Sequence, residues 1–115
     1  MPINSRSKGK RAELRLAHIL QDFGYEARRG QQFSGANGDP DVVGVPGIHI
    51  ECKDVEHLNI WNAMNQSVND ARDGEIPTVH HTKNYKPWLV TLLLPDFYEI
   101  YEKALKWDKE HEDER

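Results

Sequence analysis

One segment in the first half of the chain, residues 38–53, constrains the fold more than any other part. It reads GDPDVVGVPGIHIECK, so two apolar runs are joined by Pro46 and Gly47, a typical turn pair. The second run alternates, which predicts a strand with an apolar face made of Ile48, Ile50 and Cys52. The same alternation puts three polar residues on the opposite face of the strand: His49, Glu51 and Lys53.

The predicted turn brings a further carboxylate, that of Asp41, to the end of this strand. Asp41 begins the first apolar run, and an antiparallel return places it near Glu51 and Lys53. Clustered carboxylates raise one another's pKa unless a cation lies among them. Hard oxygen ligands favour Mg²⁺ or Mn²⁺ over Zn²⁺, and a nearby lysine can orient and help to deprotonate a water. The segment therefore predicts metal-assisted phosphodiester hydrolysis; the alternative is a surface aspartate and an unrelated Glu-x-Lys pair.

The order of short motifs along the chain resembles that of a nuclease superfamily. Pro40-Asp41 followed by Glu51-Cys52-Lys53 resembles the PD-(D/E)XK signature. The segment KGKRAE, residues 8–13, resembles the N-terminal motif of archaeal-type Holliday junction resolvases and their phage-encoded relatives. That family has a helix carrying a glutamate, a basic loop with Ser-Gly, then Pro-Asp and Glu-x-Lys. The chain has the same order over roughly residues 6–94: Glu13, Ser34-Gly35, Pro40-Asp41 and Glu51-Cys52-Lys53.

This resemblance implies roles for the residues of the motifs. Asp41 and Glu51 would bind Mg²⁺, or Mn²⁺ as a substitute, and Glu13 would bind the same cluster directly or through water. The backbone carbonyl of Cys52, beside Glu51, is a further candidate metal ligand. Lys53 would position or activate the nucleophilic water and stabilise the developing charge, leaving a product with a 5′-phosphate.

Glu13 lies on a predicted helix over residues 7–23, whose core stripe consists of Leu16, Ile19, Leu20 and Phe23. A carboxylate on the flank of a buried stripe needs a partner. Arg15 is poorly placed for this, because residues i and i+2 of a helix do not face each other. Either a basic residue elsewhere pairs with Glu13, or Glu13 completes the metal site, which the family order favours.

The charge of the chain is unevenly distributed. The net charge is −4, but residues 1–31 carry seven Lys and Arg against three acids. A basic N-terminal third can follow DNA phosphates while an acidic C-terminus stays away from them; the alternative is an ordinary solvated face with a solubilising tail. The candidate DNA-binding residues are Arg6, Lys8, Lys10, Arg11, Arg28, Arg29 and Ser34.

The composition predicts a single soluble domain. The chain has 115 residues, 37% of them hydrophobic and 30% charged, with no apolar run long enough to cross a membrane and no signal-peptide pattern. We expect one domain over residues 1–107 and a frayed acidic tail over 108–115. The single cysteine, Cys52, fits a reducing cytoplasm, that of the host if the chain is phage-encoded, and a core position.

The secondary-structure pattern predicts an α/β fold with the order α-β-β-β-α-β-β-α and a mixed β-sheet flanked by helices, the core expected of PD-(D/E)XK nucleases. The expected strands cover residues 25–29, 41–45, 48–53, 76–82 and 88–94. A helix over residues 59–72 follows the Glu-x-Lys strand. A last helix starts at Pro95-Asp96 and is expected to turn five residues inward: Phe97, Ile100, Tyr101, Ala104 and Leu105.

Other polar residues carry weaker signals. Gln66, on the helix after the Glu-x-Lys strand, resembles an accessory glutamine of many PD-(D/E)XK nucleases, although a solvated helix glutamine is an equal alternative. His80 and His81 are adjacent in a strand and point to opposite faces, so they cannot bind one ion together. Three further histidines show no zinc-site spacing: His18, His49 and His57.

The sequence thus predicts a Mg²⁺-dependent DNA endonuclease, most simply a Holliday junction resolvase acting in DNA recombination and repair. One alternative is a nuclease of the same fold with another substrate, such as a nickase, a replication-repair nuclease or a restriction-like enzyme. Another is a non-catalytic DNA-binding module. A four-way junction is cut at symmetric positions, so we expect a homodimer, with aromatic candidates for its interface in Trp61, Tyr85, Trp88 and Tyr98.

Overall fold

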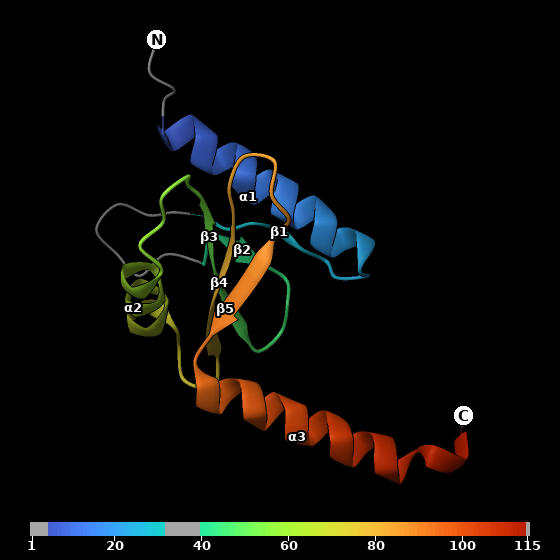
Figure 1. Ribbon diagram of the computed structural model, residues 1–115. Helices are drawn as coiled ribbons and strands as arrows, with labels where there is room; N and C mark the ends of the chain where they lie inside the picture. The colour runs from blue at the N-terminus through green and yellow to red at the C-terminus, as the bar shows by residue number, and fades with distance from the viewer. Residues whose placement is uncertain (1–4, 32–39, 115) are drawn as a thin grey trace.

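The computed structural model of the chain describes residues 5–31 and 40–114, and it has a sheet with helices beside it and one helix that extends away from it (Figure 1). The helices are α1 (Ser5–Asp22), α2 (Ile60–Asp70), α3 (Leu94–Glu110) and the short 3₁₀ helix η1 (Glu112–Glu114). The strands are β1 (Arg28–Arg29), β2 (Val42–Val43), β3 (Ile48–Asp54), β4 (Ile76–Thr82) and β5 (Leu89–Leu92). None of the described helices combines the length and the apolar character that crossing a bilayer requires.

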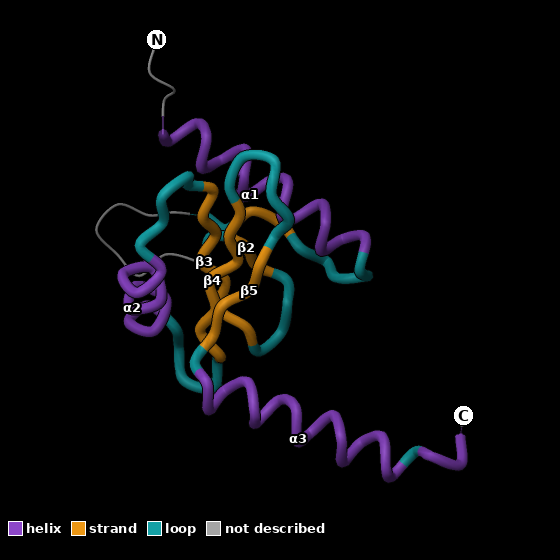
Figure 2. The backbone as a smooth tube through the Cα atoms, viewed as in Figure 1, coloured by secondary structure: helices purple, strands orange, loops and turns teal. Residues whose placement is uncertain are grey.

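The strands form one mixed sheet in the order β1-β2-β3-β4-β5 (Figure 2). β3 and β4 run parallel, from the pair Ile48–Ile76 to the pair Asp54–Thr82, and the other neighbouring strands are antiparallel. A parallel pair needs a crossover connection, and α2 supplies it between β3 and β4. The predicted α/β class with a mixed sheet is therefore confirmed.

The hairpin between β2 and β3 has its turn at Pro46 and Gly47, as predicted. Gly47 has a φ of 80°, a conformation that L side chains rarely adopt. Gly44 approaches a neighbouring segment closely, because a Cβ at this position would lie 2.2 Å from the backbone oxygen of Glu26. At the other end of the hairpin, the Asp41 N–H donates to the Ile50 carbonyl over 3.0 Å, which fixes where Asp41 lies against β3.

The two faces of the sheet are covered by different helices. α1 packs on the face that holds Ile50 and Cys52, with four buried residues: Ala12, Leu16, Ala17 and Leu20. α2 packs on the opposite face, where Ala63 and Met64 cover Val79. The alternation predicted for β3 thus separates an α1 face from an α2 face. Glu51 is paired in register with Val79, so it belongs to the α2 face.

Two residues of the predicted α1 stripe are outside the buried core: Ile19 is half-buried, and Phe23 is exposed. Phe23 is 74% exposed, so its assignment to the stripe was wrong. The reason is that α1 ends at Asp22, and Phe23 already belongs to the turn that Gly24 closes with a φ of 101°. α2 begins as predicted, because the Asn59 side chain accepts the Asn62 N–H over 3.1 Å and caps the helix.

The inward orientation predicted for the last helix was also wrong. α3 has no buried residue, and all five side chains that were expected to turn inward are exposed: Phe97, Ile100, Tyr101, Ala104 and Leu105. α3 starts directly after the edge strand β5 and projects away from the sheet, as Figure 1 shows. Apolar residues do recur along α3 at helical spacing, but no other element in the described part of the chain buries that face.

The end of the chain is more regular than the expected frayed tail. α3 continues past Trp107 to Glu110, and η1 follows it. The ring of His111 stacks on that of Trp107 with centroids 3.9 Å apart, and His111 Nδ1 lies 2.7 Å from the Trp107 carbonyl oxygen. This local contact caps the last turn of the helix.

Candidate metal and active site

The hairpin brings Asp41 and Glu51 together at the end of β2. The Oδ2 atom of Asp41 accepts the Cys52 N–H over 2.8 Å, and its carboxyl group is within hydrogen-bonding reach of Glu51. Burial and the charge of Glu51 raise the pKa of Asp41 from 3.8 to about 7, against the opposing effect of the Cys52 N–H. The charge of Glu13 raises it further. These two carboxylates therefore form one electrostatic unit.

Glu51 lies deep in the α2 face of the sheet. It is 5% exposed, and on the same face of β3 the preceding polar residue, His49, is 2% exposed. Lys53 follows on this face and is half-buried, beside its register partner His81 on β4. The polar face predicted for β3 is thus largely buried, and burial of charged groups without a partner is costly.

Glu13 has a basic partner from another element. Its Oε2 atom lies 2.5 Å from Nε of Arg29 on β1, so of the two alternatives for Glu13 the structure contains the ion pair. The charge of Glu13 still reaches Asp41, whose pKa it raises. A role of Glu13 as a metal ligand stays a prediction, as does the role of Arg29 in binding DNA.

Cys52 is a core residue, as the alternation predicted. It is buried against α1, and burial together with the charge of Asp41 raises the pKa of its thiol to about 12. The thiol is therefore protonated at neutral pH and is no nucleophile. The backbone contact that positions Cys52 is its N–H bond to Asp41. A metal bond of its carbonyl stays a prediction.

Asp54, which the sequence analysis did not single out, joins α1 to the end of β3. Its side chain is 7% exposed, and its Oδ2 atom accepts a hydrogen bond from Arg15 over 2.7 Å. Nζ of Lys8 lies 3.9 Å from its other oxygen. Extending the alternation of β3 by one residue beyond Lys53 would have placed Asp54 on the α1 face, so the signal was present in the sequence.

The candidate DNA-binding residues lie in different surroundings. Lys10, Arg11 and Arg28 are exposed, whereas Lys8 and Arg29 face acidic partners. Ser34 and the side chain of Arg6 lie outside the described residues. Gln66 is exposed on α2, and this exposure fits both alternatives, an accessory glutamine and a solvated one.

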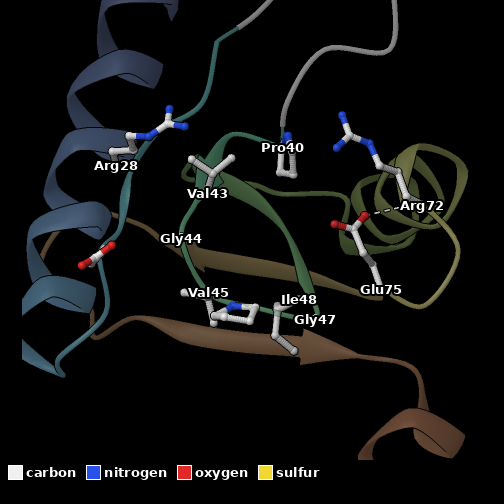
Figure 3. Close-up of a pocket in the computed structure, with 11 residues that line it drawn as sticks. Arg28, Pro40, Val43, Gly44, Val45, Gly47, Ile48, Arg72 and Glu75 are labelled. Atoms are coloured by element: carbon white, nitrogen blue, oxygen red, sulfur yellow. Dashed lines mark hydrogen bonds between the residues drawn. The ribbon is translucent and has the colours of Figure 1, made fainter.

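A pocket opens beside Pro40, the residue before Asp41 (Figure 3). Arg28 and Arg72 lie on opposite sides of it, so two guanidinium groups flank its mouth. Glu75 lines the α2 side of the pocket and accepts the Arg72 N–H over 2.7 Å. Arg72 follows α2 in a short turn, and no motif in the sequence marked it as a companion of Arg28.

A second group of ligand-type side chains surrounds His49. Its Nε2 atom lies 3.6 Å from Oε1 of Glu51, and its Nδ1 atom lies 3.7 Å from Oε1 of Glu75. Asp70, at the end of α2, completes a group in which one ligand atom each of His49, Glu51 and Asp70 lies within 4.8 Å of the others. Burial opposes protonation of His49, but the neighbouring Glu51 and the charges of Glu75 and Asp70 outweigh it and raise the pKa of His49.

The aromatic residues predicted for an interface differ in exposure. Trp61, Tyr85 and Tyr98 are exposed. Trp88 packs instead against the core under α1, with the Arg15 guanidinium 6.0 Å from its ring centre. Trp88 is therefore the least suited of the four to an interface.

Comparisons of the chain with protein-family models, with curated proteins and with solved structures found no match.

Proposed function

We propose that the chain is a metal-dependent DNA endonuclease of the PD-(D/E)XK type, most simply one that resolves four-way junctions. The observation that carries the proposal is the contact between Asp41, directly before β2, and Glu51 on β3, with Lys53 two residues further along β3. The order of elements and the mixed sheet support the PD-(D/E)XK core, and the antiparallel β2–β3 hairpin brings Pro-Asp and Glu-x-Lys to one site.

The carboxylates fit a divalent cation. The pKa of Asp41 is raised to about 7 because the group is buried and because two further acids, Glu51 and Glu13, lie near it. Such crowding is relieved when a cation lies among the oxygens. Asp41 and Glu51 would hold Mg²⁺ or Mn²⁺, with Glu13 bound directly or through water and the Cys52 carbonyl as a further ligand. The ion supplies Lewis-acid activation of the phosphate and a water of lowered pKa.

Lys53 serves the reaction from the neighbouring position on β3. Its ammonium group orients the attacking water and stabilises negative charge that develops on the phosphate. Because Lys53 is half-buried, this charge acts in a partly water-excluded site, where it is stronger than at an open surface.

Exposed basic residues near the site supply contacts to phosphates. Lys10 and Arg11 project from α1, while Arg28 and Arg72 flank the pocket beside Pro40. Such contacts position the nucleic acid without reading its sequence. We therefore expect affinity that falls with salt and depends little on base sequence.

The apolar face of α3 supports a homodimer. Phe97, Tyr98 and Tyr101 are exposed and lie against one another, with ring centroids 5.1–6.2 Å apart. A contiguous exposed aromatic patch is typical of a protein interface. One domain supplies one active site, so cutting two strands of a junction symmetrically needs a second copy.

A cleavage assay with a labelled four-way junction beside a linear duplex of the same sequence tests the proposal. We expect junction cleavage with Mg²⁺, none in EDTA, and none from Glu51→Gln or Lys53→Ala, while DNA binding stays within about three-fold because phosphate affinity comes from other residues. Lys106→Ala, an exposed lysine on α3, is the matched control and should cleave normally.

The outcomes separate the alternatives. Activity in EDTA or in Lys53→Ala would refute the mechanism. Equal cleavage of linear duplex by the wild type would favour a nuclease with another substrate. Tight DNA binding without cleavage in either Mg²⁺ or Mn²⁺ would favour the non-catalytic module.

A further inference from the structure

We propose that His49, Glu51 and Asp70 form a second cation position, selective for a transition-metal ion such as Mn²⁺, on the side of Glu51 away from Asp41. The inference rests on the proposed function only through Glu51, which both sites would share. His49 and Asp70 do not belong to the proposed hydrolytic site. Its ligands come from two elements, β3 and the end of α2.

The imidazole of His49 is the observation that points to a ligand. It is 2% exposed, and neither ring nitrogen makes a hydrogen bond to any described residue. Buried polar nitrogens without a partner are rare in proteins, because each has given up its bonds to water. Both nitrogens nevertheless face carboxylates, Nε2 towards Glu51 at 3.6 Å and Nδ1 towards Glu75 at 3.7 Å. These separations are slightly longer than hydrogen bonds.

The spacing of the three ligand atoms suits one ion. They lie within 4.8 Å of one another. Metal bonds of about 2.0–2.2 Å place two ligands of one ion up to roughly 4.4 Å apart, so small side-chain rotations close the site. Asp70 is exposed and free to make this adjustment, whereas His49 and Glu51 are held by the core.

Glu75 supplies the outer support that a metal-bound histidine needs. A ligating imidazole usually donates its other N–H to a carboxylate, which fixes the ring and raises its basicity. With Nε2 on the metal side, Nδ1 faces Glu75, and Glu75 is itself held by the Arg72 N–H at 2.7 Å. Glu75 is thus placed to accept from Nδ1 once the 3.7 Å separation shortens to a hydrogen bond.

The electrostatics of α2 favour a cation at this place. Asp70 ends the helix, and the last turn of α2 contains no basic residue. The carbonyl end of a helix carries partial negative charge, which attracts cations. A mixed set of one imidazole and two carboxylates favours Mn²⁺ and later transition metals over Mg²⁺, which prefers oxygen ligands alone. The position near Asp41 is the oxygen-only one.

Titration of the metal-free full chain with Mn²⁺, followed by electron paramagnetic resonance, tests the site without DNA or activity. We expect two bound Mn²⁺ per chain, one of them showing the electron spin-echo modulation of a directly bound imidazole nitrogen. His49→Ala should lose that modulation and one ion, whereas His18→Ala, which removes an exposed histidine of α1, should retain both. Asp41→Asn should keep the nitrogen modulation while it removes the other ion.

Two further variants keep the test decisive if His49→Ala does not fold. Asp70→Asn should weaken the nitrogen-bound Mn²⁺ at least ten-fold, and Asp73→Asn, which changes another exposed acid three residues further on, should leave it unchanged. Glu75→Gln should weaken it by about 10–100-fold, as expected of an outer-shell carboxylate.

The failures of the two proposals are distinguishable. Wild-type protein that binds Mn²⁺ without nitrogen modulation overturns the second position, even if it cleaves DNA. Nitrogen modulation that persists in His49→Ala overturns it as well. A protein that shows the modulation but cleaves no DNA retains this metal position and loses the proposed nuclease function.

Discussion

Exchange of Asp41 for asparagine isolates the charge of one carboxylate in the cluster. Asparagine keeps an oxygen that can accept the Cys52 N–H, so the substitution removes charge and little else. In metal-free protein at pH 8 we expect Asp41→Asn to be more stable than the wild type by roughly 1–2 kcal/mol, because the charged carboxylate is buried beside Glu51. Millimolar Mg²⁺ should stabilise the wild type but not the variant, since it binds the folded state.

The magnitude follows from the pKa of Asp41. It rises from 3.8 to about 7 in the folded protein. At about 1.4 kcal/mol for each ten-fold change in proton affinity, this difference sets an upper limit of about 4 kcal/mol on the cost of the charge. Burial is the largest cause of this shift and the charge of Glu51 the next, and both are relieved in part when side chains rearrange and water enters the cluster. Roughly 1–2 kcal/mol is therefore the measurable part.

The direction in which stability depends on pH follows from the sign of the pKa shift of Asp41. The folded pKa of Asp41 is higher than the unfolded one, so its contribution to stability is fully present below about pH 4 and is lost as the pH rises through about 7. Urea unfolding in EDTA between pH 4 and pH 8 measures the difference between wild type and Asp41→Asn. Asp22→Asn, an exposed aspartate at the end of α1, is the control. Equal stabilities of wild type and Asp41→Asn at pH 8, with no effect of Mg²⁺ on either, would refute the clustering.

Three further substitutions test the fold and the assembly. Gly44→Ala puts a Cβ 2.2 Å from a backbone oxygen at a φ of 103°, so urea unfolding should show a loss of at least about 2 kcal/mol, and an unchanged midpoint would contradict the close approach. Arg15→Met leaves the buried Asp54 without its closest partner and should cost about 1–3 kcal/mol, against less than about 0.5 kcal/mol for the exposed Arg11→Met. Phe97→Asp should convert a dimer into a monomer by light scattering with little change in melting temperature, and a wild type that is monomeric at every concentration would refute the interface.

The β2–β3 hairpin was predictable because it depends on local rules. Turn residues at 46–47 and strict alternation in β3 are sufficient to put Ile50 under α1 and Glu51 on the other face. The antiparallel return then brings Asp41 to Glu51 without any long-range knowledge. The α/β class followed from the order of elements in the same way.

The residues of other elements that contact the hairpin were harder to predict from the sequence. Arg29 pairs with Glu13, and Asp70 and Glu75 approach His49, because separate elements meet in the fold. No spacing along the chain encodes such meetings, and His49 accordingly showed no zinc-like pattern. The predicted orientation of α3 was wrong for a related reason. Periodicity shows that Phe97 belongs to an apolar face, but it does not show what that face contacts.

The buried charges of this domain are the strongest physical reason to assign it a chemical role. A domain of 115 residues has a small core, and each buried ionisable group weakens it. Yet His49 and Glu51 take two neighbouring positions on the α2 face of the central strand, where Val79 beside them is fully buried. An apolar pair would fill the same space and stabilise the sheet more. Because the charges contribute less to stability than apolar residues of the same size would, their presence supports the proposal that they bind cations.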